Sequence, residues 1–429
     1  MPNNWKIYKL GELGDIKGGK RLPKGEALVT SKTKHPYVRV TDMGTRTIPI
    51  EKLQYVPDDV FPKISRYIVN TDDLIISIVG TVGSVSIIDK KLDNASLTEN
   101  CVKITNYKNI DKEYLYYFLT SDIGRFEISK GIVGSTQPKL PIYNINDLEI
   151  SLPENIEEQK SIAAILSAID DKIENNLAIN KTLEEMAMAL YKHWFVDFGP
   201  FQDGEFVESE LGRIPKGWEV KSLGEIADFI NGYAFKSGDL KSEDDGNSYH
   251  VFKMGHIERG GGLKENATKS YIEKIKCQKL EKYILKVGDL LMAMTDMKDN
   301  VAILGNTALI NENDKYIVNQ RVGLIRPKNQ IGIDYSFLYL TTNENSFIER
   351  LRSQANSGVQ VNLSTEAIKS AKMIIASEEV NKKFDDLVKP LYNNIFQNKI
   401  ESQTLTQLRD TLLPKLISGE VRLKEFQES

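Results

Sequence analysis

The chain has 429 residues with a formal net charge of −4, and 27% of its residues are charged. That length predicts two or three domains, each with its own core. Two cysteines cannot cross-link such a chain, so we expect Cys101 and Cys277 to be reduced core thiols of a cytoplasmic protein. The first residues form no signal peptide, and no apolar run approaches the ~20 residues of a membrane span. The acidic balance argues against a simple basic nucleic-acid binder.

An internal repeat organises the chain. The segment WKIYKLGELGDIKGG from Trp5 aligns without a gap with WEVKSLGEIADFING from Trp218, and Gly19 matches Gly232. Further matches keep the same order with slowly growing offsets: residues 73–75 with 289–291, 114–120 with 335–341, and 137–140 with 360–363. The sequence therefore predicts two copies of one unit, joined head to tail.

The first copy begins with short apolar runs, such as 74–79 and 84–88, separated by Gly, Asp, Asn and Pro, which is typical of a mixed domain with short strands. After Pro153 the pattern becomes helical, and Asn155 with Glu158 forms a plausible capping box. The following apolar stripe has the 3.5-residue period of a coiled-coil seam. It contains Ile162, Leu166, Ile169, Ile173, Asn176, Asn180, Leu183, Ala187, Leu190 and Trp194.

The second copy repeats this change from a mixed domain to a helix. Its predicted seam contains Val380, Phe384, Leu387, Leu391, Asn394, Asn398, Glu401, Leu405, Leu408 and Leu412. Pro390 is expected to kink or delay this helix, because proline removes a backbone donor.

Asparagines occupy equivalent positions in the two seams, where Asn176 matches Asn394 and Asn180 matches Asn398. In an antiparallel pair of helices, Asn176 would face Asn398 and Asn180 would face Asn394. Hydrogen-bonded amides inside a seam fix its register. The alternative is that these side chains face solvent.

Catalytic and cofactor motifs are missing from the sequence. Residues 14–21 (GDIKGGKR) are one residue short of a phosphate-binding loop, and Arg21 stands where Ser or Thr would bind magnesium. His35, His193, His250 and His256 have no metal-ligand spacing. No serine-nucleophile elbow and no adenine-methyltransferase loop is present. We therefore expect a non-catalytic protein with no cofactor and no bound metal.

Charge is unevenly distributed along the chain. Residues 1–155 and 216–375 each carry a net charge of +2, residues 156–215 carry −7, and residues 376–429 carry −1. Both predicted domains are thus mildly basic, and the acidity belongs to the first helix and its exit. Lysines and arginines clustered on one face suffice for phosphate contacts whatever the total charge. A solvated surface without a partner is the alternative.

Four segments in this order resemble the specificity (S) subunit of type I DNA restriction-modification enzymes, across nearly the whole chain. They are EEQKSIAAILSAID at 157–170, LYKHWFVDFGP at 190–200, IPKGWEVKSLGEI at 214–226 and LRDTLLPKLISGEV at 408–421. One departure is the start of the second helix, which reads Glu378-Glu379-Val380 without the Glu-Gln usual in this family.

The resemblance implies an α+β fold in which two similar target recognition domains, 1–155 and 201–375, are separated by two long helices with a pseudo-twofold repeat. The helices, 156–200 and 376–429 with its tail, would form an antiparallel coiled-coil spacer. Each domain would read one half of an asymmetric bipartite sequence in double-stranded DNA. The expected partners are two methyltransferase (modification) subunits and the restriction/translocase subunits, with no membrane. A helix over 157–193 is ~56 Å long, equal to ~16 base pairs, so both half-sites and their gap should fit within that length.

The candidate DNA-binding residues are polar or basic groups in loops. They are Lys20, Arg21, Arg39, Arg46, Gln137 and Lys139 in the first domain, and Lys236, Lys253, Arg259, Arg352, Gln360 and Asn362 in the second. We expect Arg39→Ala to weaken DNA binding more than a substitution on the helix face. Trp194, Phe195 and Phe198 form either a partner-docking patch or a cap on the coiled coil. The rival functions are a coiled-coil structural adaptor without a DNA role and a methyltransferase-nuclease fragment.

Overall fold

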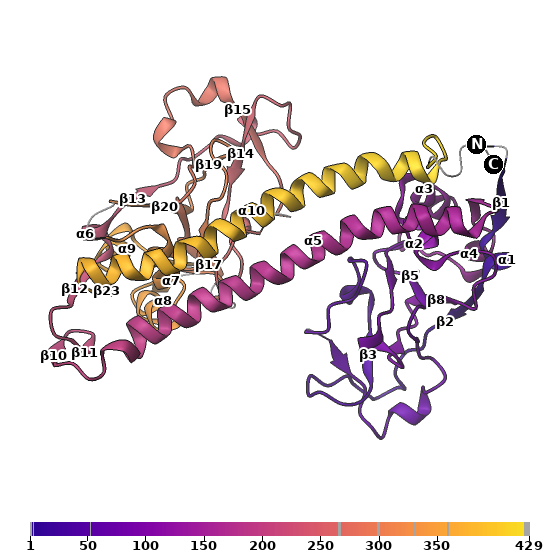
Figure 1. Ribbon diagram of the computed structural model, residues 1–429, viewed down its shortest axis with the longest axis horizontal. Coiled ribbons are helices and arrows are strands. Elements are labelled where there is room, and N and C mark those ends of the chain that lie inside the picture. Colours follow the sequence, from indigo (N-terminus) through magenta and orange to yellow (C-terminus); the bar gives the residue numbers. More distant parts are fainter. Residues whose placement is uncertain are drawn as a thin grey trace. The chain divides into compact units, whose positions relative to one another are not determined.

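The computed structural model describes residues 2, 4–51, 53–264, 267–297, 301–328, 332–357 and 360–423 (Figure 1). The chain divides into two compact units, Met1–Asn175 with Glu401–Ser429, and Asn176–Ile400. Each unit contains one globular domain and a part of both long helices, α5 (Ile156–Tyr191) and α10 (Glu378–Ile417). We call the globular part of unit 1 the first domain and that of unit 2 the second domain.

The first domain is built from short strands and four helices. Its strands are β1 (Trp5–Lys9), β2 (Asp15–Gly18), β3 (Pro36–Val38), β4 (Gln54–Tyr55), β5 (Leu74–Ser77), β6 (Val85–Ile87), β7 (Ser96–Leu97), β8 (Cys101–Thr105) and β9 (Glu149–Pro153). Its helices are α1 (Leu10–Leu13), α2 (Lys112–Thr120), α3 (Asp122–Gly131) and α4 (Ile142–Asn146). The strands form sheets in the orders β1-β9, β2-β8-β5-β6 and β4-β3-β7.

The second domain has the same kinds of element. Its strands are β10 (Phe206–Ser209), β11 (Gly212–Pro215), β12 (Glu219–Ser222), β13 (Ala227–Asn231), β14 (Ser248–Phe252), β15 (Tyr271–Glu273), β16 (Leu290–Ala293), β17 (Thr295–Met297), β18 (Thr307–Leu309), β19 (Tyr316–Val318), β20 (Val322–Pro327), β21 (Asn356–Ser357), β22 (Gln360–Asn362) and β23 (Lys372–Ile375). Its helices are α6 (Leu223–Ile226), α7 (Tyr335–Thr342), α8 (Asn345–Ser353) and α9 (Thr365–Ser370).

The internal repeat is confirmed by the strand order. The sheets β12-β23, β13-β20-β16-β18 and β15-β14-β19 repeat the three sheets of the first domain, including the parallel pairing of β14 with β19 that matches β3 with β7. The matched glycines have a steric reason. A Cβ atom on Gly19 would lie 2.0 Å from the carbonyl oxygen of Thr98, and one on Gly232 would lie 2.0 Å from that of Asn319. Both positions therefore exclude a side chain.

Each domain has an apolar core, and each core contains one of the two cysteines, as predicted. Cys101 and Cys277 are buried and free. Burial raises the pKa of the Cys101 thiol to about 12, which keeps it protonated and unreactive. Among the described residues, no helix is long and apolar enough to cross a membrane.

The starts of the long helices differ in part from the sequence pattern. The side chain of Asn155 accepts a hydrogen bond from the Glu157 amide, as a cap should. The Glu158 carboxylate does not complete a capping box but is buried and pairs with Arg422 at 2.9 Å. Pro390 does not delay α10, which begins at Glu378 and continues through the proline.

The seam predicted on α5 is buried or half-buried along its length. On α10 the prediction is partly wrong, because Leu387, Asn394 and Leu408 are exposed. The side chains buried instead in unit 2 are Val388, Tyr392 and Ile395. These three belong to a core that also contains residues of the second domain, so α10 buries a face set by the domain as well as by α5.

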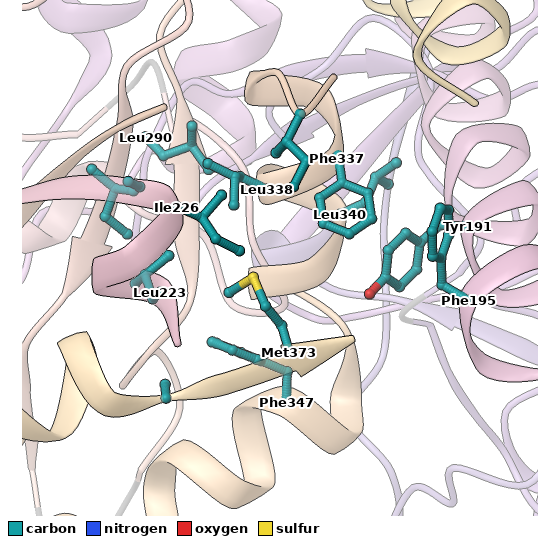
Figure 2. Close-up of a cluster of buried hydrophobic side chains, with 14 of the residues drawn as sticks. Tyr191, Phe195, Leu223, Ile226, Leu290, Phe337, Leu338, Leu340, Phe347 and Met373 are labelled. Carbon is teal, nitrogen blue, oxygen red and sulfur yellow. The ribbon is translucent and has the colours of Figure 1, made fainter. Parts of the chain in front are cut away.

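The end of α5 lies inside that core, together with the five-residue π-helical turn Lys192–Val196 that follows it. Phe195 is only 2% exposed, and its ring lies 4.9 Å from those of Phe337 and Phe384. Figure 2 shows Tyr191 and Phe195 beside Phe337 of α7. Trp194 and Phe198 pack against the same core and are half-buried. The aromatic group is therefore part of the core of unit 2 and does not form an open docking patch.

Asparagine amides link α5 and α10 within unit 2. The Asn398 Nδ2 donates to Asn180 Oδ1 at 2.9 Å, Asn176 Nδ2 to the Asn398 carbonyl at 3.5 Å, and Asn180 Nδ2 to the Ile395 carbonyl at 3.5 Å. The residue numbers run in opposite directions, so the helices are antiparallel here. The expected pairing of Asn180 with Asn394 is corrected, because the amide that reaches Asn180 belongs to Asn398 one turn later.

This arrangement predicts that replacing two different asparagines of α10 by alanine will lower the free energy of unfolding by different amounts. Asn398→Ala should lower the free energy of unfolding by about 1–3 kcal/mol, because the buried Asn180 oxygen loses its donor. Asn394→Ala is the matched control with the same change in helix propensity, and its exposed side chain should cost less than about 0.5 kcal/mol. Urea unfolding of both variants measures the difference, and equal losses would contradict the assignment.

Candidate nucleic-acid interface

Basic residues follow the glycine that both domains share. In the first domain the Lys20 amide donates to the Leu97 carbonyl at 2.8 Å, which fixes the backbone while the side chain stays exposed. The Lys20 ammonium lies 5.7 Å from the centre of the Tyr67 ring. The Arg21 side chain is 80% exposed and pairs with Glu99 at 2.6 Å. An exposed ion pair of this kind contributes little to stability, so Arg21 can exchange its partner at low cost.

A second pair of equivalent segments carries exposed amides. Lys139 forms β-bridges with Val79 and Val133, and Leu140 is buried next to them. In the second domain Asn362 lies opposite Thr295 in the pairing of β22 with β17, and Leu363 is buried. The buried leucines donate their amides to the matching carbonyls of Ile78 and Met294, at 3.0 and 2.9 Å. The structure thus presents Gln137 and Lys139 in one domain, and Gln360 and Asn362 in the other, as exposed groups on equivalent supports.

Three candidate arginines are engaged inside the protein. The Arg39 guanidinium binds both oxygens of Asp42, at 3.0 and 2.8 Å, and Gln54 at 2.5 Å. Arg352 donates to the carbonyls of Leu304 and Ala302, and burial lowers its pKa.

Arg46 is also occupied, and its side chain is only 13% exposed. It pairs with Glu113 of α2 at 3.2 Å and with Asp171 of α5. Because two carboxylates already use its donors, Arg46 belongs to the junction between the first domain and α5 and not to an open surface. The expected effect of Arg39→Ala on DNA binding stays a prediction.

The remaining candidates lie in the second domain, where Lys236 and Arg259 are exposed and Lys253 is half-buried. Aromatic residues that were not singled out from the sequence lie beside the shared glycine. Tyr233 follows Gly232, and its ring lies 5.0 Å from that of Phe235 and 5.4 Å from that of Tyr283. The Lys282 ammonium is 4.9 Å from the Tyr283 ring. The signal in the sequence is the pair of aromatic residues, Tyr233 and Phe235, directly before Lys236.

Below this surface two histidines contact each other, which their six-residue spacing did not predict. His256 Nδ1 lies 3.1 Å from both the amide nitrogen and the carbonyl oxygen of Lys253. Its Nε2 is within hydrogen-bond distance of His250 Nε2, at 3.0 Å. Burial, His256 and nearby Lys315 and Lys269 lower the pKa of His250 to about 4. Among the described residues, no group of three His, Cys, Asp or Glu side chains is placed to hold a metal.

Several exposed apolar side chains lie on the long helices. In unit 2, Leu177 and Met186 of α5 are 60% and 53% exposed, and Leu387 and Ile400 of α10 are similarly open. Leu177 and Met186 lie outside the seam, whose members in this stretch are Asn176, Asn180, Leu183 and Ala187. These side chains are not part of the buried core, and they leave apolar surface open to solvent on both helices.

A family model described as "Type I restriction modification DNA specificity domain" matches the chain twice, over residues 2–185 and 215–408. The chain belongs to this family. The two matches correspond to the two copies of the repeat, and each covers one domain with most of the helix that follows it.

Similar proteins cover the chain almost from end to end. The MjaIX specificity subunit of a type I restriction enzyme from Methanocaldococcus jannaschii is 28% identical over 99% of this chain and 95% of its own length. The HindI specificity subunit from Haemophilus influenzae is 25% identical over 78% of this chain and 83% of its own. The crystal structure of the type I S subunit from M. genitalium has a TM-score of 0.59 at 20% identity and covers 97% of each chain, which supports the same fold.

The histidine contact predicts acid sensitivity of this family member. The pKa of His250 lies lower in the folded chain than its ordinary value of 6.5, so the unfolded chain binds this proton more readily. The neutral His250 therefore contributes fully to the free energy of unfolding above about pH 6.5. This contribution declines as the pH falls toward 4, by about 2 kcal/mol between pH 7 and 5. Urea unfolding at the two pH values measures this. His250→Phe should flatten the dependence, and an unchanged slope would exclude His250 as its source.

Proposed function

We propose that this chain selects the DNA target of a type I restriction-modification complex, and that each domain reads one half of an asymmetric bipartite sequence. The observation that carries the proposal is the pair of equivalent supports described above. Buried leucines anchor them in the same way, yet they present Gln137 and Lys139 in the first domain and Gln360 and Asn362 in the second. Different side chains on one scaffold are what two different half-sites require. Because the ligand is cellular DNA, we expect the protein in the cytoplasm.

The chemistry of these groups matches the DNA grooves. Gln and Asn amides can bind adenine N6 and N7 together, whereas lysines mostly contact phosphates and set the register. We assign base reading to Gln137, Gln360 and Asn362. Phosphate contacts are assigned to a second set, Lys20, Arg21, Lys139, Lys236, Lys253 and Arg259. This assignment leaves out Arg46 and Arg352, whose guanidinium groups bind internal acceptors, and Arg39, whose guanidinium binds Asp42 and Gln54.

Two methyltransferase subunits are proposed to dock on the helices, and restriction/translocase subunits to join through the complex. The exposed apolar residues Leu177 and Met186 favour α5 for this contact, on the two sides of the helix that flank the seam. We do not include the aromatic residues Trp194, Phe195 and Phe198 in this proposed contact, because they pack in or against the core of unit 2. In this proposal the chain itself performs no catalysis and binds no cofactor, and the methyltransferase supplies the reaction.

The proposed reading predicts separable half-sites. Methylation sequencing of cells that express the chain with its methyltransferase should give one asymmetric bipartite motif. Gln137→Ala should relax one half of that motif only, and Gln360→Ala the other half only, with about 1–3 kcal/mol of discrimination lost at the affected base. A single short palindrome would contradict the function. No sequence-specific binding at all would favour the structural adaptor.

The docking surface predicts a loss of assembly without a loss of fold. Leu177→Glu with Met186→Glu should weaken methyltransferase binding at least tenfold, because a charge is desolvated in the contact. Ile275→Glu is a matched control, since Ile275 is 64% exposed and lies in the second domain away from the helices. Analytical ultracentrifugation of the mixed subunits measures assembly, and equal binding by both variants would exclude Leu177 and Met186 from the contact.

A further inference from the structure

A buried polar cluster joins the first domain to both helices of unit 1. The Tyr117 hydroxyl of α2 donates to Asp170 Oδ2 of α5 at 2.8 Å, and Arg409 Nη1 of α10 donates to Asp170 Oδ1 at 2.9 Å. Asp170 is buried. Its two carboxylate oxygens accept hydrogen bonds from groups on two other elements. We call Tyr117, Asp170 and Arg409 the junction cluster.

Arg46 adds a second connection one residue further along α5. It links the segment after β3 to Asp171 of α5 and to Glu113 of α2. Adjacent carboxylates of one helix therefore bind side chains from two separate parts of the first domain. Such directional contacts hold the domain at one angle to the helix, because each donor must point at its acceptor.

The second copy of the repeat has no such cluster at the equivalent positions. The repeat matches Tyr117 with Leu338, Asp170 with Val388, and Arg409 with Tyr191. All three counterparts are buried in the large apolar core of unit 2, where Tyr191 lies 5.8 Å from Phe337. The three cluster positions are thus polar in unit 1 and apolar in unit 2, although unit 2 keeps an ion pair next to them, between Lys389 of α10 and Asp334 at 2.6 Å.

Stability alone does not explain the polar version. Burying an ion pair costs desolvation energy, and well-packed apolar replacements are often as stable or more so. The neighbouring space is also not filled by apolar packing. A cleft of about 620 Å³ lies beside the cluster, lined by Tyr117, Asp170 and Arg409 together with Gly44, Arg125 and Asp410. The directional contacts therefore act together with the apolar core that α5 and α10 share with the first domain.

We infer that Arg46 and the junction cluster are positioning residues for DNA recognition, which restrict the length of the unread gap that the protein accepts. The inference rests on the proposed function. A domain that turns on its helix pair moves its half-site along and around the DNA, where one base pair corresponds to ~3.4 Å and about a tenth of a turn. Fixing that angle therefore excludes targets whose gap is one base pair too short or too long.

The test copies the apolar junction into unit 1 with the triple variant Tyr117→Leu, Asp170→Val, Arg409→Tyr. The wild-type target is first determined by methylation sequencing. The complex with the methyltransferase is then assayed on duplexes whose gap is correct, one base pair shorter or one base pair longer. We expect the triple variant to read both half-sites but to lose at least tenfold of the wild-type preference for the correct gap.

Lys172→Ala is the control, because it removes only an exposed ion pair between α5 and Glu401 of α10. It should keep the wild-type preference. If the triple variant fails to fold, Arg46→Gln replaces it, with an expected loss of about threefold in gap preference.

The outcomes separate the two proposals. A wild-type complex without a bipartite target would refute the proposed function. A wild-type preference that the folded variant retains in full would overturn the positioning role alone. Altered bases in one half-site, with an unchanged gap preference, would mean that the cluster acts on base reading, and would also overturn it.

Discussion

The antiparallel contact between α5 and α10 is the constraint on which both units depend. Each domain buries side chains from both helices, and in unit 1 these are Ile162 and Leu166 of α5 with Leu416 and Ile417 of α10. Segments more than 200 residues apart in the sequence are thus required for one core. The Arg422 pair with Glu158 closes the same unit beyond the end of α10. Each domain needs both helices to complete its own core, so the two copies of the repeat depend on each other structurally.

Much of this fold could be predicted because its signals are local or repeated. The two copies, the change from short strands to a helix, and the seam of α5 all follow from spacing within one segment. The seam of α10 was harder to predict. A heptad pattern assumes a single partner helix, whereas Val388 and Tyr392 face a core shared with the second domain. The shift also moved Asn394 out of the seam and left Asn398 to bind Asn180.

The roles of the arginines were beyond the sequence for a related reason. Arg46 pairs with Asp171, which is 125 residues away in the sequence, and no local sequence pattern near either residue predicts the pair. A basic residue in a loop is compatible with a DNA contact and with an internal ion pair alike. By contrast, the equivalence of Gln137 and Gln360 could be predicted because the repeat aligns them, and the structure leaves both exposed on matching supports.

The distribution of charge agrees with a division of labour between domains and helices. The segment 156–215 carries −7, while each domain carries a small positive charge. Phosphates are repelled by the acidic stretch and attracted by the domains, so electrostatics favours DNA contacts through the domains. Exposed apolar residues such as Leu177 and Met186 lie on the acidic helix, where a protein partner tolerates them and a phosphate backbone gains nothing from them. The net charge of −4 is therefore the sum of two mildly basic domains and one acidic segment.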